Sequence, residues 1–181
     1  MRTKNRRRLG AVTLAAALAA PLGLAATTGT ATAAPYCGIH WGSLPKTSSN
    51  MTTAAVTGVR SGRHECYDRI VFDLGRGKGK VGYNVRYVGT VTGPGSGLPV
   101  PVSGGARIQV TVNAPATKRI PASGTINYTG WETFRQLKWV ASFEGYTDFG
   151  LGVRARLPMR VFVLSGPDGG QRLVVDVAHR W

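Results

Sequence analysis

Two cysteines and two histidines near the start of the chain are the residues best suited to metal chemistry. Cys37 and His40 are separated by two residues, and His64 and Cys66 by one. Two thiolates and two imidazoles form the ligand set of a tetrahedral zinc site, although these spacings are not those of a standard finger. In an exported protein, two cysteines most simply form one disulfide instead. We therefore expect a Cys37–Cys66 disulfide and no cofactor, with zinc as the alternative.

Catalytic groups are scarce. The chain has neither a Gly-x-Ser-x-Gly nor a His-Glu-x-x-His motif. Two carboxylates that cleave a glycoside must lie about 5 to 10 Å apart. The eligible acids fall mostly at expected turns: Glu132, Glu144, Asp148 and Asp168. His179 ends the last expected strand, and a lone histidine in such a place is usually structural. We expect a noncatalytic protein, with a small secreted enzyme or enzyme inhibitor as the alternative.

Binding chemistry is suggested by two stretches with one shared pattern, at residues 69–74 and 172–177. Each has the order Arg, apolar, Val, apolar, Asp, apolar. Side chains alternate between the two faces of a strand, so the apolar residues would enter a core. These expected core residues are Ile70, Phe72, Leu74, Leu173, Val175 and Val177. The charged residues expected to look outward are Arg69, Asp73, Arg172 and Asp176.

These four outward charges have two interpretations. Arginine and aspartate four positions apart on one strand are separated by about 13 Å and cannot pair with each other. They could form cross-strand ion pairs that keep a solvated face soluble. Alternatively, they could form a flat polar surface that binds a glycan with acidic and amide groups. On the second interpretation, the glycan-binding residues are Arg69, Asp73, Arg172 and Asp176.

The elements that must position these residues are short strands. Besides 67–74 and 172–179, strand patterns occur in the following ranges: 56–60, 82–88, 106–113, 148–153 and 158–164. Residues 61–63 are expected to form a turn, and residues 89–104 and 113–130 to form irregular connections. Residues 131–143 suggest a loop to about Arg135 and then a strand. About eight short strands and little helix predict an all-β fold, an antiparallel β-sandwich or barrel.

The first 33 residues have the pattern of a signal peptide. A basic start, Arg2 to Arg8, precedes an Ala/Leu run that Pro21 interrupts, and Ala31-Thr32-Ala33 offers a cleavage site. Either general secretion or the twin-arginine route fits the basic start. We expect no stable membrane anchor. Residues 34–55 are then an arm tied down by the disulfide, closing a loop of about 28 residues that stabilises by roughly 3 kcal/mol. Residues 56–181 form the domain.

The mature chain is strongly basic. Residues 1–33 contain five of the 23 lysines and arginines and none of the eight acids, which leaves a net charge of +10. Such a charge suits anionic surroundings such as teichoic acids or acidic glycans, although solubility alone also accounts for it. The basic residues are dispersed rather than gathered in one run. This distribution argues against nucleic acid as a partner.

Several blocks of the chain resemble the AMIN-like domain family of small secreted or lipid-anchored actinobacterial proteins. The blocks are CGIHWGSLP (37–45), GRHECYDRIVFDL (62–74), GYNVRYV (82–88), FEGYTDFGLG (143–152), PMRVFVL (158–164) and RLVVDVAH (172–179). That family is similar to the AMIN domains of periplasmic amidases and secretins. The resemblance implies a β-sandwich of two related sheets that targets proteins to the cell wall by binding peptidoglycan. We therefore expect a secreted, wall-associated module that binds peptidoglycan or an associated anionic wall polymer.

Overall fold

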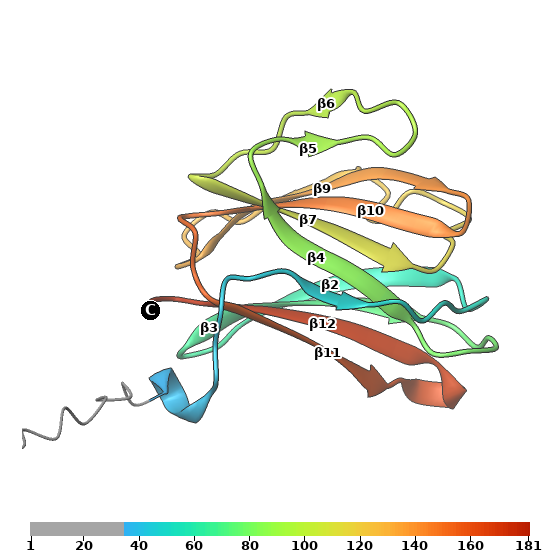
Figure 1. Cartoon of the computed structure of the whole chain (residues 1–181), viewed down its shortest axis with the longest axis horizontal. Helices are drawn as coiled ribbons and strands as arrows, with labels where there is room; N and C mark the ends of the chain where they lie inside the picture. The colour runs from blue at the N-terminus through green and yellow to red at the C-terminus, as the bar shows by residue number, and fades with distance from the viewer. Residues whose placement is uncertain (1–34) are drawn as a thin grey trace, which may run out of the picture. The chain divides into compact units, whose positions relative to one another are not determined.

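Two antiparallel sheets face each other across a single core in the computed structural model, which describes residues 35–181 (Figure 1). The expected antiparallel β-sandwich with little helix is confirmed, with twelve strands rather than about eight. The only helical segments among the described residues are two three-residue 3-10 turns, Tyr36–Gly38 and Pro167–Gly169. The signal peptide expected at residues 1–33 lies outside the described residues.

The larger sheet has six strands in the order β1-β4-β7-β10-β9-β8. Its strands are β1 (Lys46–Ser48), β4 (Gly82–Val88), β7 (Ala106–Asn113), β8 (Thr125–Asn127), β9 (Phe134–Phe143) and β10 (Tyr146–Val153). A tight turn at Glu144 and Gly145 joins β9 to β10, and both residues have positive φ angles. Glycine adopts such angles without strain, so this turn needs its glycine.

The smaller sheet has four strands in the order β11-β12-β3-β2. Its strands are β2 (Val56–Arg63), β3 (Tyr67–Leu74), β11 (Met159–Ser165) and β12 (Gln171–Ala178). The two stretches with the shared Arg–Val–Asp pattern are therefore the two central strands, β3 and β12. They lie antiparallel, with Arg69 opposite Asp176 and Arg172 opposite Asp73.

The core lies where the inner faces of the two sheets meet. All six residues expected to enter it from β3 and β12 are buried, as are Ile108, Val110 and Val112 from β7. Phe72 of the smaller sheet packs against Phe149 of the larger one, with ring centroids 4.6 Å apart. Burying a side chain of this size contributes about 1.5–3 kcal/mol, so these contacts hold the sheets together.

A flap made of residues 89–105 covers part of the outer face of the larger sheet. It contains the two-residue strands β5 (Val91–Thr92) and β6 (Pro99–Val100), which lie above β9 and β10 (Figure 1). A Cβ at Gly152 would collide with the carbonyl oxygen of Ser103, and one at Gly150 with Val102. The glycines of β10 therefore allow the flap to lie directly on the sheet.

Several details of the expected strand pattern are wrong. The connections expected to be irregular at residues 89–104 and 113–130 contain the short strands β5, β6 and β8. Residues 61–63 are not a turn, because β2 continues to Arg63 and pairs with β3 as far as Asp68. The arm at residues 34–55 is not entirely irregular either, because β1 pairs with the edge of β4. Both segments are ordered by hydrogen bonds to a neighbouring strand, which local alternation does not reveal.

Candidate functional site

The outer face of the smaller sheet gathers arginine and aspartate side chains into two clusters. In the antiparallel register, each arginine of β3 or β12 stands directly opposite an aspartate of the other strand. Neighbouring strands add Arg60 from β2 and Arg160 from β11. One cluster therefore forms around Asp176 and the other around Asp73.

The Asp176 cluster is buried. The Asp176 carboxylate is fully inaccessible to solvent and accepts hydrogen bonds from the guanidinium groups of Arg69 (2.7 and 2.9 Å) and Arg160 (2.8 Å). This carboxylate also holds the pKa of Arg69 above its ordinary value. The expectation that Asp176 forms part of an exposed polar face is wrong, because its arginine partners and their aromatic neighbours cover it.

Aromatic rings enclose these arginines. The Arg160 guanidinium lies 5.3 Å from the ring centroid of Trp41 and 5.2 Å from those of Tyr67 and Phe162. Arg69 lies over Tyr67 and Phe162 as well. Cation–π contacts of this kind contribute about 0.5–2 kcal/mol. The Asp176 cluster therefore fixes the side chains of this face.

The Asp73 cluster is open to solvent. Arg60, whose side chain is 55% exposed, forms a bidentate pair with Asp73 at 2.7 and 2.9 Å. Arg172 approaches the same carboxylate at 3.7 Å. Hydrogen bonding to Asp73 raises the pKa of Arg60. Exposed pairs contribute only about 0–1 kcal/mol to stability, so these arginines remain available to a ligand.

A depression of about 340 Å³ lies between the two clusters, and we call it the arginine depression. Three arginines line it around an apolar floor of Val71 and Val174. Its lining residues are Arg60, Ser61, Gly62, His64, Arg69, Val71, Leu164, Arg172 and Val174. No carboxylate lines the depression, so it presents cationic groups beside an aliphatic surface. This combination suits an anionic ligand that also has an apolar face.

The Nε atom of Arg172, a residue that lines this depression, is a buried donor that faces Asp73. It is buried and has no hydrogen-bond partner among the described residues, because Asp73 stops 3.7 Å away. A buried donor without a partner costs about 1–3 kcal/mol, which an acceptor from a ligand would relieve. Arg172 therefore has a donor that neither Asp73 nor any other described residue satisfies.

The four residues predicted to bind a glycan have different positions in this site. Arg69 and Arg172 line the depression together, whereas Asp73 and Asp176 act as their ion partners outside it. Sequence reasoning did not select Arg60, although this residue ends the strand expected at residues 56–60, because the pairing of that strand with β3 is not visible in the sequence. It also missed Arg160, although this residue has outward parity in β11.

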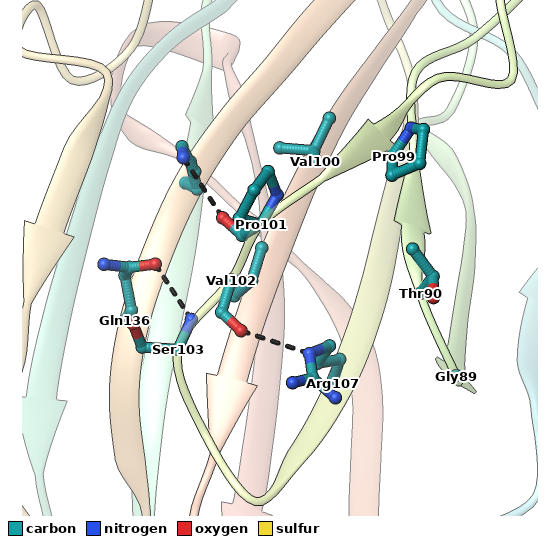
Figure 2. Close-up of a pocket in the computed structure, with 10 residues that line it drawn as sticks. Gly89, Thr90, Pro99, Val100, Pro101, Val102, Ser103, Arg107 and Gln136 are labelled. Atoms are coloured by element: carbon teal, nitrogen blue, oxygen red, sulfur yellow. Dashed lines mark hydrogen bonds between the residues drawn. The ribbon is translucent and has the colours of Figure 1, made fainter.

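A second hollow, of about 540 Å³, lies between the flap and the larger sheet (Figure 2). Arg107 and Lys138 both line it, and their side chains donate to flap carbonyl oxygens, those of Val102 and Pro101. Gln136 accepts a hydrogen bond from the Ser103 amide on the same side. These contacts use the polar groups to hold the flap in place.

The cysteines form a disulfide, with Cα atoms 6.4 Å apart. It ties residues 36–44 to the turn before β3. Since both sulfurs are used in this bond, the zinc alternative with Cys37, His40, His64 and Cys66 is wrong. Within residues 35–181, no three His, Cys, Asp or Glu side chains are grouped so that they could hold a metal ion.

The carboxylates considered for catalysis are dispersed. Glu144 and Asp168 lie in turns, and Asp148 is buried beside Thr111 on the outer face of the larger sheet. Burial raises the pKa of Asp148. Glu132 is exposed and lies 3.7 Å from the ring of His179, which is buried. Of these four acids, only Glu132 has a histidine beside it.

The described part of the chain contains no helix of the length and apolar character needed to cross a bilayer.

Comparison with known proteins assigns the chain to a family. The model of the AMIN-like domain matches residues 54–179, which include every strand from β2 to β12 and all the arginines of the depression. No curated protein and no solved structure matches the chain. The family match extends over most of the sequence and over every strand of the sandwich except β1. The chain therefore belongs to the AMIN-like domain family.

Proposed function

We propose that this protein is a noncatalytic cell-envelope module that binds peptidoglycan or an associated anionic wall polymer through the arginine depression. The observation that carries the proposal is the set of three guanidinium groups, from Arg60, Arg69 and Arg172, around an aliphatic floor with no carboxylate in the lining. The anionic groups of wall polymers are carboxylates and phosphates. Arginine binds both in bidentate geometry.

The fixed position of the Arg69 side chain supports the proposal that the arginine depression binds a wall polymer. Arg69 is fixed by the buried Asp176 and by aromatic rings, so it loses little side-chain freedom when a ligand binds. Arg172 contributes a buried donor without a partner. The net charge of +10 that remains without residues 1–33 would draw the whole domain toward a polyanion. Charge then brings the polymer to the surface, and the depression supplies the specific contacts.

The proposal also includes the cellular location of the protein. A disulfide is typical of proteins outside the reducing cytoplasm. We propose that residues 1–33 direct export and are removed, and that the mature domain stays with the cell wall. Cell-wall association, rather than nucleic acid or membrane binding, is the role we assign to the basic surface.

Co-sedimentation with purified sacculi tests the proposal. The mature protein is mixed with sacculi, with and without covalently attached teichoic acid, over a series of salt concentrations. We expect saturable binding that the double substitution Arg60→Gln and Arg172→Gln weakens at least about tenfold, or 1.4 kcal/mol. Because both side chains are partly exposed, the double variant should remain folded.

A charge-matched variant is the control for nonspecific attraction. Lys80→Gln with Lys118→Gln removes the same charge from two exposed positions outside the depression. This variant should bind sacculi almost as well as the unmodified protein. If both double variants lose binding equally, attraction by net charge accounts for the effect and the arginine depression is not the site. No sedimentation at any salt concentration would refute the proposed function itself.

A further inference from the structure

A polar pocket distinct from the arginine depression also has His64 in its lining. We call it the carboxylate pocket. Its volume is about 600 Å³, and its lining includes Glu65, Asp68, Glu132, His179 and Arg63. Three carboxylates and one guanidinium give it the opposite charge balance to the arginine depression. An acidic pocket is unexpected on so basic a protein.

Asp68 is a buried carboxylate with one unused oxygen. It is 1% exposed, and it lies on β3 in the same inward alternation as Ile70 and Phe72. Its Oδ2 accepts hydrogen bonds from the backbone amides of Thr133 (2.8 Å) and Phe134 (2.9 Å). Its Oδ1 is buried and has no partner among the described residues. A carboxylate at the edge of a core is costly unless its acceptors are used, so this oxygen calls for a donor.

The two unused buried side-chain atoms of the described chain each lie in a residue that lines a cavity. One is the Nε donor of Arg172, which lines the arginine depression and also a hollow beside Asp73, and the other is the Oδ1 acceptor of Asp68, which lines the carboxylate pocket. Buried polar groups are nearly always satisfied in folded proteins. This coincidence points to ligands of opposite chemistry at the two cavities.

The walls of the carboxylate pocket are held in place. The Nε2–H of His179 donates to the His64 carbonyl oxygen at 2.9 Å, since a carbonyl can only accept. The Nδ1 of His179 lies 2.9 Å from the Thr133 hydroxyl. Arg154 donates to the carbonyl oxygens of Glu132 and His179, which joins the loop before β9 to the end of β12. These bonds fix the backbone around the pocket, whereas the carboxylate of Glu132 itself is exposed.

We propose that the carboxylate pocket binds a primary ammonium group, presented by a wall peptide, an occupant that rests on the function proposed above. An ammonium carries three donors, which match the free oxygen of Asp68 and the carboxylate of Glu132. A metal ion fits less well, because no three candidate ligands are grouped anywhere in residues 35–181. His64 lines both this pocket and the arginine depression, so one ligand with an acidic group and an amine can reach both.

A pair of lysine derivatives tests the ammonium site. The first probe is Nα-acetyl-lysine methylamide, and the second is the same molecule with its ε-amine acetylated. Binding is followed by NMR at the backbone amides of Thr133 and Phe134, which donate to Asp68. We expect saturable shifts with the free amine and none with the acetylated probe. Equal shifts with both probes, or no shift with either, would overturn the ammonium site.

Substitutions of the carboxylates that line the pocket test whether the NMR shifts come from binding there. Glu132→Gln changes an exposed side chain and should raise the Kd of the amine probe about fivefold or more. The control is Glu144→Gln in the β9–β10 turn, which removes the same charge outside the pocket and should leave the Kd unchanged. Asp68→Asn should abolish the shifts. If Asp68→Asn does not fold, Glu132→Gln still tests the site. Equal affinities for all variants would refute the site.

Arg60→Gln with Arg172→Gln distinguishes this inference from the proposed function. Neither arginine lines the carboxylate pocket, so binding of the amine probe should be unchanged when binding to sacculi is lost. Loss of probe binding in that variant would contradict the assignment to a separate pocket.

Discussion

At the scale of single residues, the two cross-strand Arg–Asp pairs of β3 and β12 lie in different environments. Asp176 and Asp73 each stand opposite an arginine in the β3–β12 register. Asp176 is buried beneath its partners, whereas Asp73 is partly exposed beside Arg60. The Arg–Val–Asp pattern predicted which residues point outward. It could not predict that Arg160 and the aromatic rings of Trp41 and Phe162 would cover one of the two aspartates.

This difference gives a matched pair of substitutions. Asp176→Asn removes the charge that two guanidinium groups surround, and it should lower the free energy of unfolding by about 3–5 kcal/mol. Asp73→Asn alters an exposed cluster and should cost less than about 1 kcal/mol. Urea denaturation of the two variants measures both values. Equal losses would show that burial does not distinguish the clusters.

The buried Tyr128 and the partly buried Tyr87 contribute to the response of stability to alkali. Burial raises the pKa of Tyr87 and of Tyr128 to about 12, from an ordinary value near 10. The folded state therefore keeps protons that the unfolded state releases, and the stability from these groups is present below about pH 10 and lost as the pH rises through about 12. Tyrosinate absorbance should show two late-titrating groups. Tyr128→Phe should remove one of them, whereas Tyr146→Phe, at an exposed ring, should remove neither.

At the scale of elements, alternation predicted the long strands well and the short ones poorly. The predicted ranges of β4 and β7 agree with the structure, and β3 has the expected core face. The strands β1, β5, β6 and β8 have only two or three residues, too few for a period of two to be recognised. They form because a neighbouring strand offers hydrogen bonds. The arginine depression was only half predicted for a related reason, since it needs residues from β2 and β11 beside those of β3 and β12.

The flap depends on a glycine of the strand beneath it. A side chain at Gly152 would collide with the flap backbone at Ser103, so Gly152→Ala should cost about 1–3 kcal/mol and loosen residues 89–105. Gly89→Ala is the matched control, because a Cβ there meets nothing within 4 Å. Thermal unfolding and amide exchange at Ser103 measure the two effects. Unchanged exchange in Gly152→Ala would mean that the flap is not held by this contact.

The disulfide attaches the N-terminal arm to the sandwich. Replacing both cysteines, Cys37→Ser with Cys66→Ser, should lower the free energy of unfolding by about 3–4 kcal/mol, given a sequence separation of 29 residues. Trp41, which lies over Arg160, should then become more mobile and its fluorescence should change. A variant with unchanged stability and fluorescence would show that the sheet holds the arm without the bond.

At the scale of the whole molecule, charge is unevenly organised. The chain without residues 1–33 carries a net charge of +10, yet its two polar cavities beside His64 have opposite characters. Composition predicted the attraction to polyanions. It could not predict an acidic pocket, because the lining comes from three distant parts of the sequence, around Glu65 and Asp68, at Glu132 and at His179. Membership of the AMIN-like domain family is consistent with a cell-wall role, and under the proposed function the two cavities would bind anionic and amine groups of a wall polymer.

Mapping the binding face by NMR tests the central claim most directly. The labelled domain is titrated with soluble peptidoglycan fragments, and the perturbed backbone amides are assigned. We predict that the shifts concentrate on β2, β3 and β12 around Arg60, Arg69 and Arg172, and that they weaken in the Arg60→Gln and Arg172→Gln variant. Shifts confined to the flap hollow of Figure 2, with the arginine depression unaffected, would contradict the account.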